Sequence, residues 1–211
     1  MKKLTLAAVA LLAIAGMAMA ETFTINYQPV SGQLGNMSIT SGEAYVSDVG
    51  ITTNGNMKIT ASGTTGNRTR LSNWADGSLD ISFTIADGFE LTAGTLSANM
   101  AATAVTCPNL VAWELAGTKV DSSATFETVN TAVDLTASWS GLSATGAQTL
   151  SGMRSANATN MNGGGGAQNG TLNINSLSFT GTVQATVPEP ATLGLLGLGA
   201  LAVVLRRKLR K

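Results

Sequence analysis

Residues 79–85 read Leu-Asp-Ile-Ser-Phe-Thr-Ile and carry the clearest strand pattern in this chain of 211 residues. The apolar side chains of this stretch alternate strictly with Asp, Ser and Thr. Successive side chains of a β-strand point to opposite faces, so this alternation indicates a strand with one buried face. The stretch therefore predicts a sheet that is apolar on one side and polar on the other.

The same alternation recurs along the middle of the chain. It is present in residues 23–27, 111–115 and 133–139. Between residues 172 and 187 the pattern changes phase at Asn175-Ser176. One extra residue exchanges the two faces of a strand, so this change predicts a bulge or a tight turn.

Turn residues separate these runs. Asn54-Gly55 lies between residues 51–53 and 57–60, and it predicts a two-residue β-hairpin. Asp87-Gly88 similarly joins the strand at 79–85 to residues 89–91.

The sequence predicts an all-β domain with about ten strands, no soluble helix and one long loop. The loop spans Ser151–Gly170 and contains the glycine run Gly163–Gly166. Two antiparallel sheets packed face to face, as a β-sandwich or jelly roll, fit this pattern best. The alternative is a one-sided β-solenoid, but no fixed period of about 20 to 30 residues is present.

The N-terminal residues Met1–Ala20 read as a secretory signal peptide. Two lysines precede a short apolar core, and Ala18 and Ala20 are small residues at the positions that a signal peptidase reads. Cleavage after Ala20 would leave Glu21 as the first residue of the mature chain. The alternative is a retained N-terminal anchor.

The other end of the chain combines an apolar run with a basic tail. Ala191–Leu205 is uncharged and apolar over 15 residues, about 22 Å as a helix, which is shorter than the membrane hydrocarbon core of about 30 Å. The run predicts a short transmembrane helix. Basic residues stay on the cytoplasmic side, so the preceding domain is expected outside. The tail contains Arg206, Arg207 and Lys208.

Pro188, Glu189 and Pro190, followed by the Gly- and Leu-rich run and the basic tail, resemble the PEP-CTERM sorting signal. The resemblance implies that an exosortase, a membrane-embedded peptidase, cuts near Pro-Glu-Pro. Proteins with this signal are typically cell-surface or matrix proteins of bacteria that make exopolysaccharide. The alternative is an ordinary membrane anchor. The expected domains are a signal peptide (1–20), a β-sandwich exterior domain (21–187) and a sorting signal (188–211).

Composition excludes several classes of active site. The chain has no histidine and one cysteine, so it lacks imidazole chemistry, histidine metal ligands and a disulfide within the chain. Cys107 is expected to be buried, with an intermolecular bridge as the alternative. Residues 21–187 carry 11 acidic and five basic side chains. No nucleotide-binding or catalytic serine motif occurs there, so we expect a domain that is not an enzyme.

The acidic residues suggest two further hypotheses. Two carboxylates suffice for glycoside hydrolysis, but solvation at turns explains the acids near the two Asp-Gly pairs. Calcium could bind where carboxylate and backbone oxygens meet, although no repeated spacing of aspartates is present, and no cofactor is expected. These acids are Asp76, Asp80, Asp87 and Glu90.

Trp74 is the aromatic residue with the most polar surroundings. Asn73 and Asp76 lie beside it, so an exposed indole could stack on a sugar while its neighbours bind hydroxyl groups. The alternative is a tryptophan folded over an open sheet edge. Trp113 and Trp139 lie on alternating apolar faces and are expected in the core.

Three functions remain open for the exterior domain. The first is a non-catalytic surface or matrix protein associated with exopolysaccharide. The second is a carbohydrate-binding module of jelly-roll type, and the third is a polysaccharide hydrolase. The expected partners are signal peptidase and exosortase, the inner membrane as a transient location, and possible exopolysaccharide; nucleic acid is not expected. The exported protein would pass from an inner-membrane intermediate to the cell surface or the extracellular space.

Overall fold

The computed structural model describes residues 20–30, 33–60, 68–74, 76–162 and 170–186. These residues form strands and loops without a helix, and Ala20–Gln184 make one compact unit. The described strands are β1 (Ala20–Val30), β2 (Gln33–Ser41), β3 (Val46–Gly55), β4 (Lys58–Thr60), β5 (Thr69–Ser72), β6 (Gly77–Ile85), β7 (Phe89–Ala102), β8 (Val111–Leu115), β9 (Thr118–Asp121), β10 (Ala132–Ala144), β11 (Ala147–Arg154) and β12 (Thr171–Ala185).

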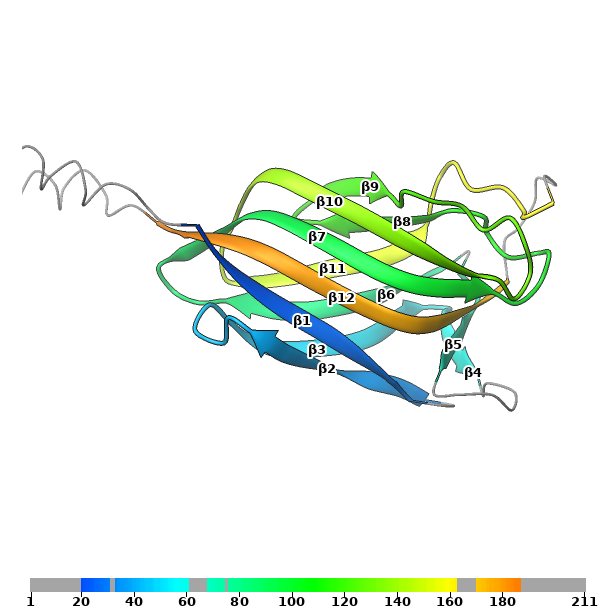
Figure 1. Ribbon diagram of the computed structural model, residues 1–211, viewed down its shortest axis with the longest axis horizontal. Coiled ribbons are helices and arrows are strands. Elements are labelled where there is room, and N and C mark those ends of the chain that lie inside the picture. The colour runs from blue at the N-terminus through cyan, green and yellow to red at the C-terminus, as the bar shows by residue number, and fades with distance from the viewer. Residues whose placement is uncertain (1–19, 31–32, 61–67, 75, 163–169, 187–211) are drawn as a thin grey trace, which may run out of the picture. The chain divides into compact units, whose positions relative to one another are not determined.

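The strands form two sheets that lie one behind the other (Figure 1). Sheet A has the order β10-β7-β12-β1-β2. In addition, β5 pairs with β12, and β4 pairs with β5. Sheet B has the order β3-β6-β11-β8-β9. Antiparallel pairs join neighbours in both, for example β1 with β12 and β6 with β11. The expected all-β class with two antiparallel sheets is confirmed.

Aromatic side chains from both sheets meet in the core. Phe23 and Phe179 come from sheet A, and the ring of Phe83 comes from sheet B. The Phe83 centroid lies 5.7 Å from that of Phe23 and 5.3 Å from that of Phe179. All three rings are buried. Burial of large apolar side chains is the main stabilising contribution to such a sandwich.

The strands predicted from alternation are present. Residues 79–85 lie in β6, 111–115 form β8, and 133–139 lie in β10. The phase change of β12 is confirmed as well, because Leu172 and Leu177 are both buried in one continuous strand. The strand changes its pairing partner there, from β5 up to residue 174 to β1 from residue 178.

Both predicted hairpins are wrong. Asn54 and Gly55 are the last two residues of β3, which pairs with β6 in sheet B, whereas β4 pairs with β5 in sheet A. The turn at Asp87-Gly88 leads from β6 in sheet B to β7 in sheet A. The chain therefore passes from one sheet to the other after β3 and after β6. The glycines do adopt the positive φ values that such turns need, 65° at Gly55 and 83° at Gly88.

A tight hairpin does join β8 to β9. Ala116 and Gly117 between them have φ values of 49° and 76°, and two successive positive φ values are typical of a type I′ turn. The predicted loop is also shorter than expected, because Ser151–Arg154 belong to β11. Twelve strands are described in place of about ten, since the short β4, β5 and β9 show too few alternations to be recognised.

Several predictions fall on residues that lie outside the described part of the chain. They are the signal peptide up to residue 19, the apolar run Ala191–Leu205, the Pro-Glu-Pro element with its basic tail, and Gly163–Gly166. In the part that is described, no helix has the length and apolar character needed to cross a membrane.

Candidate binding site on sheet A

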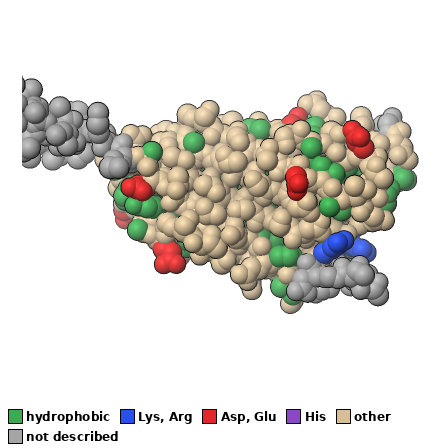
Figure 2. Space-filling view, viewed as in Figure 1, with side chains coloured by type: hydrophobic (Ala, Val, Ile, Leu, Met, Phe, Trp, Pro, Cys, Tyr) green, Lys and Arg blue, Asp and Glu red, His purple; other side chains and the backbone are tan. Residues whose placement is uncertain are grey.

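The outer face of sheet A consists almost entirely of hydroxyl and amide side chains. Over most of β1, β7, β10 and β12 every second residue is buried, and the residues between them face outward. Cross-strand neighbours on this face are polar pairs. They include Thr24 with Thr180, Asn26 with Ser178, Ser97 with Thr136, and Asn99 with Asp134. Figure 2, which views this face, shows few charged or hydrophobic side chains.

A hollow of about 590 Å³ lies across four adjacent strands of this face. Its outward-facing lining comes from β1, β7, β10 and β12, so segments far apart in the sequence build it together. Asp134 is the one carboxylate in the lining, and no cationic side chain contributes. We call the polar members of this lining the polar hollow: Asn26, Ser97, Asn99, Asp134, Thr136, Ser176 and Ser178. The lining also includes Tyr27, Ala98, Leu135 and Leu177.

Hydrogen bonds between side chains hold one wall of the polar hollow in place. Asn175 donates from Nδ2 to Oδ1 of Asn99 at 2.6 Å, and Asn99 donates from Nδ2 to Oδ1 of Asp134 at 2.7 Å. The phase change of β12 positions Asn175 for this contact, while the next residue, Ser176, lines the hollow. The Oδ1 atom of Asn175 is buried without a hydrogen-bond partner among the described residues. The chain of amides fixes the carboxylate orientation.

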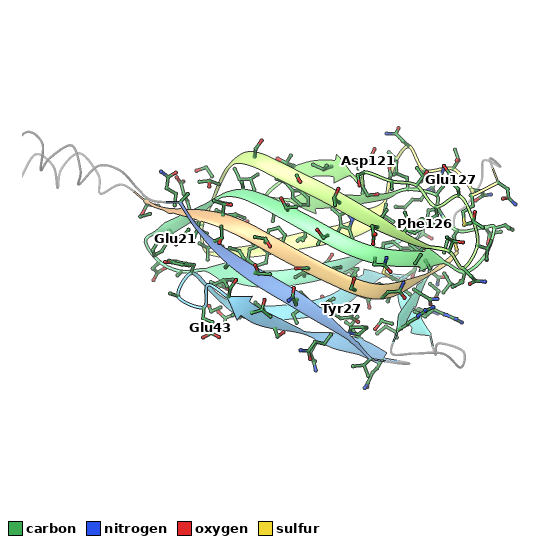
Figure 3. All side chains as sticks on the ribbon, in the orientation of Figure 1. Glu21, Tyr27, Glu43, Asp121, Phe126 and Glu127 are labelled. Carbon is green, nitrogen blue, oxygen red and sulfur yellow. The ribbon has the colours of Figure 1, made fainter. Side chains whose placement is uncertain are left out.

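The buried side chain of Tyr27 connects the strands next to the hollow. Figure 3 shows this residue on β1. Its hydroxyl lies 2.5 Å from Oγ1 of Thr69 and accepts a hydrogen bond from the backbone N–H of Gly35 at 2.8 Å. Both groups are buried, so these bonds satisfy a polar atom that would otherwise destabilise the core. The contact ties β1 to β2 and β5 beside the hollow.

The hypothesis that Trp74 is exposed is wrong, and the alternative of an indole that folds inward agrees with its burial. Its side chain is 0% exposed and belongs to the hydrophobic core. A sugar ring can stack only on an accessible indole face, so Trp74 provides no platform for a glycan. Its polar neighbours misled the sequence interpretation, because they face the solvent while the indole turns inward.

Asn73 and Asp76, the two residues predicted to assist Trp74, shape a turn. Asn73 has a φ of 63° and donates from Nδ2 to the backbone oxygen of Asn56 at 3.1 Å. The backbone oxygen of Asp76 accepts a hydrogen bond from the N–H of Asn56 at 3.0 Å. Neither residue lines the polar hollow.

The other acidic residues singled out in the sequence are dispersed. Asp87 and Asp76 are exposed, and Glu90 accepts a hydrogen bond from Ser143 at 2.8 Å. Asp80 is not a solvated turn residue, since it lies within β6, is 8% exposed and accepts a hydrogen bond from Asn54. Among the described residues, no three Asp, Glu, Cys or His side chains are grouped as metal ligands would be.

The remaining core predictions are confirmed. Trp113 and Trp139 are 0% and 4% exposed, and Trp139 donates from Nε1 to the backbone oxygen of Thr118 at 2.9 Å. Cys107 is buried, and its Sγ donates to the backbone oxygen of Thr171 at 3.0 Å.

Sequence reasoning missed every residue of the polar hollow. The sequence predictions rest on the apolar half of each alternating strand, whereas the hollow consists of residues from the polar half. The available signal was the lack of charge among the polar residues of these strands, which contrasts with the charged side chains that usually solvate an exposed face. Their convergence from four strands depends on the strand order, which alternation does not reveal.

The predicted processing sites lie next to the two ends of the domain. Ala20 and Glu21 begin β1, where Ala20 pairs with Gln184 of β12. Ala18 lies outside the described residues. Residues 186–208 match the family described as the PEP-CTERM protein-sorting motif. This chain carries a PEP-CTERM sorting motif. The PEP-CTERM match contains Pro188, Glu189, Pro190, Arg206, Arg207 and Lys208, and it supports export and sorting of the chain.

Solved structures match this chain at low similarity. A CBM35 module from Cellvibrio japonicus is 18% identical with a TM-score of 0.38, and the match covers 80% of this chain and 99% of that module. A Xyl-CBM35 in complex with a disaccharide containing glucuronic acid is 20% identical with a TM-score of 0.34, covering 68% of this chain and 93% of that one.

An exo-β-1,3-galactanase from Phanerochaete chrysosporium is 13% identical with a TM-score of 0.39. That match covers 68% of this chain and 30% of the galactanase. All three TM-scores are below 0.5, so these likenesses assign no function to this chain. No curated protein matches it.

Proposed function

We propose that this chain is an exported, non-catalytic protein of the bacterial surface or extracellular matrix, and that an exosortase processes it through the PEP-CTERM motif. One observation carries the proposal. The sorting motif begins at residue 186, directly after β12 ends at Ala185. Cleavage within the motif would therefore release a domain that keeps all of its described strands.

The chemistry of the domain supports a role without catalysis. Glycoside hydrolysis typically needs two carboxylates that flank one bond. The polar hollow contains one, Asp134, and an amide of Asn99 already engages it. Asp121, another acidic side chain, accepts hydrogen bonds from Ser155 at 2.6 Å and Asn157 at 3.1 Å and thereby fastens a loop.

The sorting proposal makes a clear prediction about the tail. Surface material should lack residues 191–211, whereas cells without exosortase should keep the full tail in the inner membrane. Replacing Pro188, Glu189 and Pro190 with alanine should also trap the full chain there. Fractionation followed by immunoblotting tests this, with one antibody against the domain and one against an epitope placed after Lys211.

The exosortase-deficient strain is the control for the alanine variant, since both should give the same inner-membrane species. Mature surface protein that still carries the second epitope would show that the tail is an ordinary anchor. The proposal of sorting and processing would then be wrong.

A second candidate function is carbohydrate binding. The composition of the polar hollow favours it, because side chains that both donate and accept hydrogen bonds suit a ligand rich in hydroxyl groups. The association with exopolysaccharide that we propose for the surface protein would then have a physical basis in sheet A.

A further inference from the structure

We infer that the outer face of sheet A binds a neutral polysaccharide through hydrogen bonds, with the polar hollow as the centre of the site. The inference rests on the proposed function, because it needs the domain to lie outside the cytoplasm where such polymers occur. It assigns the site to residues far from Trp74.

The polar hollow offers both donors and acceptors of hydrogen bonds. Each hydroxyl can donate one hydrogen bond and accept others, and each amide carries both kinds of group. The hydroxyls of Ser97, Ser176 and Ser178 have no side-chain hydrogen bond to another described residue. They are available to a ligand, while Asn99 and Asp134 are held in a fixed orientation by the amide chain from Asn175.

The charge of the lining and the lack of exposed large hydrophobic side chains on the described part of this face indicate which class of ligand the hollow can bind. The lining of the hollow includes one carboxylate and no cation, so an anionic polymer would meet repulsion without a counter-charge. Among the described residues, Val105 is the one large hydrophobic side chain that is exposed. Protein–protein interfaces usually depend on large apolar or aromatic anchor side chains, and no such side chain is exposed among the described residues of this face. An uncharged polymer with many hydroxyl groups fits both observations.

The shape of the site suits a chain-like ligand. The hollow crosses four strands, and three steps between neighbouring strands at about 4.8 Å each give about 14 Å. Polar pairs continue along the strands beyond the hollow, with Thr24 and Thr180 3.2 Å apart between their Oγ1 atoms and Thr95 and Ser138 3.4 Å apart between their hydroxyl oxygens. A polymer that leaves the hollow in this direction therefore remains in contact with polar side chains.

Binding at a single site should be weak. Protein–sugar hydrogen bonds replace hydrogen bonds to water, and the described surface of this face adds no aromatic stacking. Many copies displayed on one surface would bind a single polymer together, and the effective concentration of neighbouring sites would then raise the overall affinity. Many weak sites together can therefore hold a polymer at the surface while each single site binds and releases it quickly.

The inference is tested by native gel electrophoresis of the full-length chain through gels that contain a polysaccharide. The chain is kept in a polyoxyethylene detergent, which has no sugar headgroup to compete. We expect dextran or hydroxyethyl cellulose, both neutral, to slow migration relative to a gel without polysaccharide. Alginate, which is anionic, can bind the basic tail, so any retardation by alginate should be the same for the unchanged chain and for the Ser97→Ala, Thr136→Ala variant described below. Retardation by alginate that this variant loses, or no retardation by either neutral polymer, would overturn the inference.

The site itself is tested by two matched pairs of substitutions. Ser97→Ala with Thr136→Ala removes two hydroxyls that face each other in the hollow. Ser82→Ala with Thr149→Ala removes the same two residue types from a cross-strand pair on the exposed face of sheet B. We expect the first variant to lose about tenfold in affinity for dextran, as for the loss of two neutral hydrogen bonds, and the second to bind as the unchanged protein does.

Equal losses in the two variants would place binding elsewhere and overturn the assignment to sheet A. Circular dichroism of each variant distinguishes a lost contact from a lost fold, and Asn99→Ala gives an independent variant of the same site. This test is independent of the test of the proposed function, which measures whether the C-terminal tail is removed from the surface protein. A protein that is processed normally but never retarded would overturn the glycan site alone.

Discussion

The burial of Trp74 determines how much its substitution should change the free energy of unfolding. Its indole is fully buried, so Trp74→Ala should lower the free energy of unfolding by about 3–5 kcal/mol, as other large-to-small core substitutions do. Trp139→Ala should cost about as much, because that side chain is also buried. Denaturant unfolding of the two variants should give similar midpoints.

Val105→Ala is the control for the tryptophan variants, since Val105 is 48% exposed. It should leave the unfolding midpoint almost unchanged. A Trp74 variant that unfolds together with the Val105 variant would contradict the buried position of the indole.

Cys107 provides a second test at the residue scale. The thiol is buried against the backbone oxygen of Thr171, so alkylating reagents should reach it slowly in the folded protein. We expect labelling to become rapid once denaturant unfolds the domain. Rapid labelling of the native protein would show that the thiol is accessible, and mass spectrometry measures both rates.

Gly55, the last residue of β3, and Gly88, in the turn before β7, make a matched pair, since both have positive φ where the chain passes between the sheets. A Cβ atom at Gly88 would meet no atom within 4 Å, whereas one at Gly55 would lie 2.3 Å from the backbone oxygen of Asp76. Gly88→Ala should therefore cost only the left-handed backbone penalty of about 1–2 kcal/mol. Gly55→Ala should cost clearly more, because backbone atoms must also move.

Thermal unfolding of the two glycine variants measures this difference. Equal shifts in melting temperature would mean that the close approach at Gly55 is relieved without cost. The position of the turn between β3 and β4 would then be different from the one described.

Strands were predictable from the sequence because burial acts on every second side chain of a strand. Residues 79–85 show this directly, since their apolar members are all buried in β6. The pairing of strands was not predictable, because a turn such as Asn54-Gly55 has the same residues whether it joins neighbours in one sheet or strands in two. Local turn chemistry contains no information about the partner. The polar hollow was missed for the same reason, since it depends on the order of β10, β7, β12 and β1.

At the scale of the whole molecule, β12 occupies the middle of sheet A between β7 and β1. A chain shortened to end at Asn175 would lose the part of β12 that pairs with β1 and would leave Phe23 and Phe83 without the ring of Phe179. We expect this variant to lose the native fold. A chain that ends at Thr186 keeps every described strand and should remain folded.

Resistance to protease and the circular dichroism spectrum distinguish the two shortened chains. A stable, β-rich product from the chain that ends at Asn175 would show that the second half of β12 is dispensable. Its central place in sheet A would then have no consequence for stability.

The place of β12 also sets an order of events in time. A polypeptide is synthesised from its N-terminus, so β1 is made first and β12 is made last among the described strands. Until β12 arrives, β1 has one neighbour, β2, where the finished sheet gives it two. The sandwich therefore closes only when its final strand is available, and the sorting motif follows that strand immediately. The moment at which folding can finish and the moment at which the signal for processing appears are nearly the same.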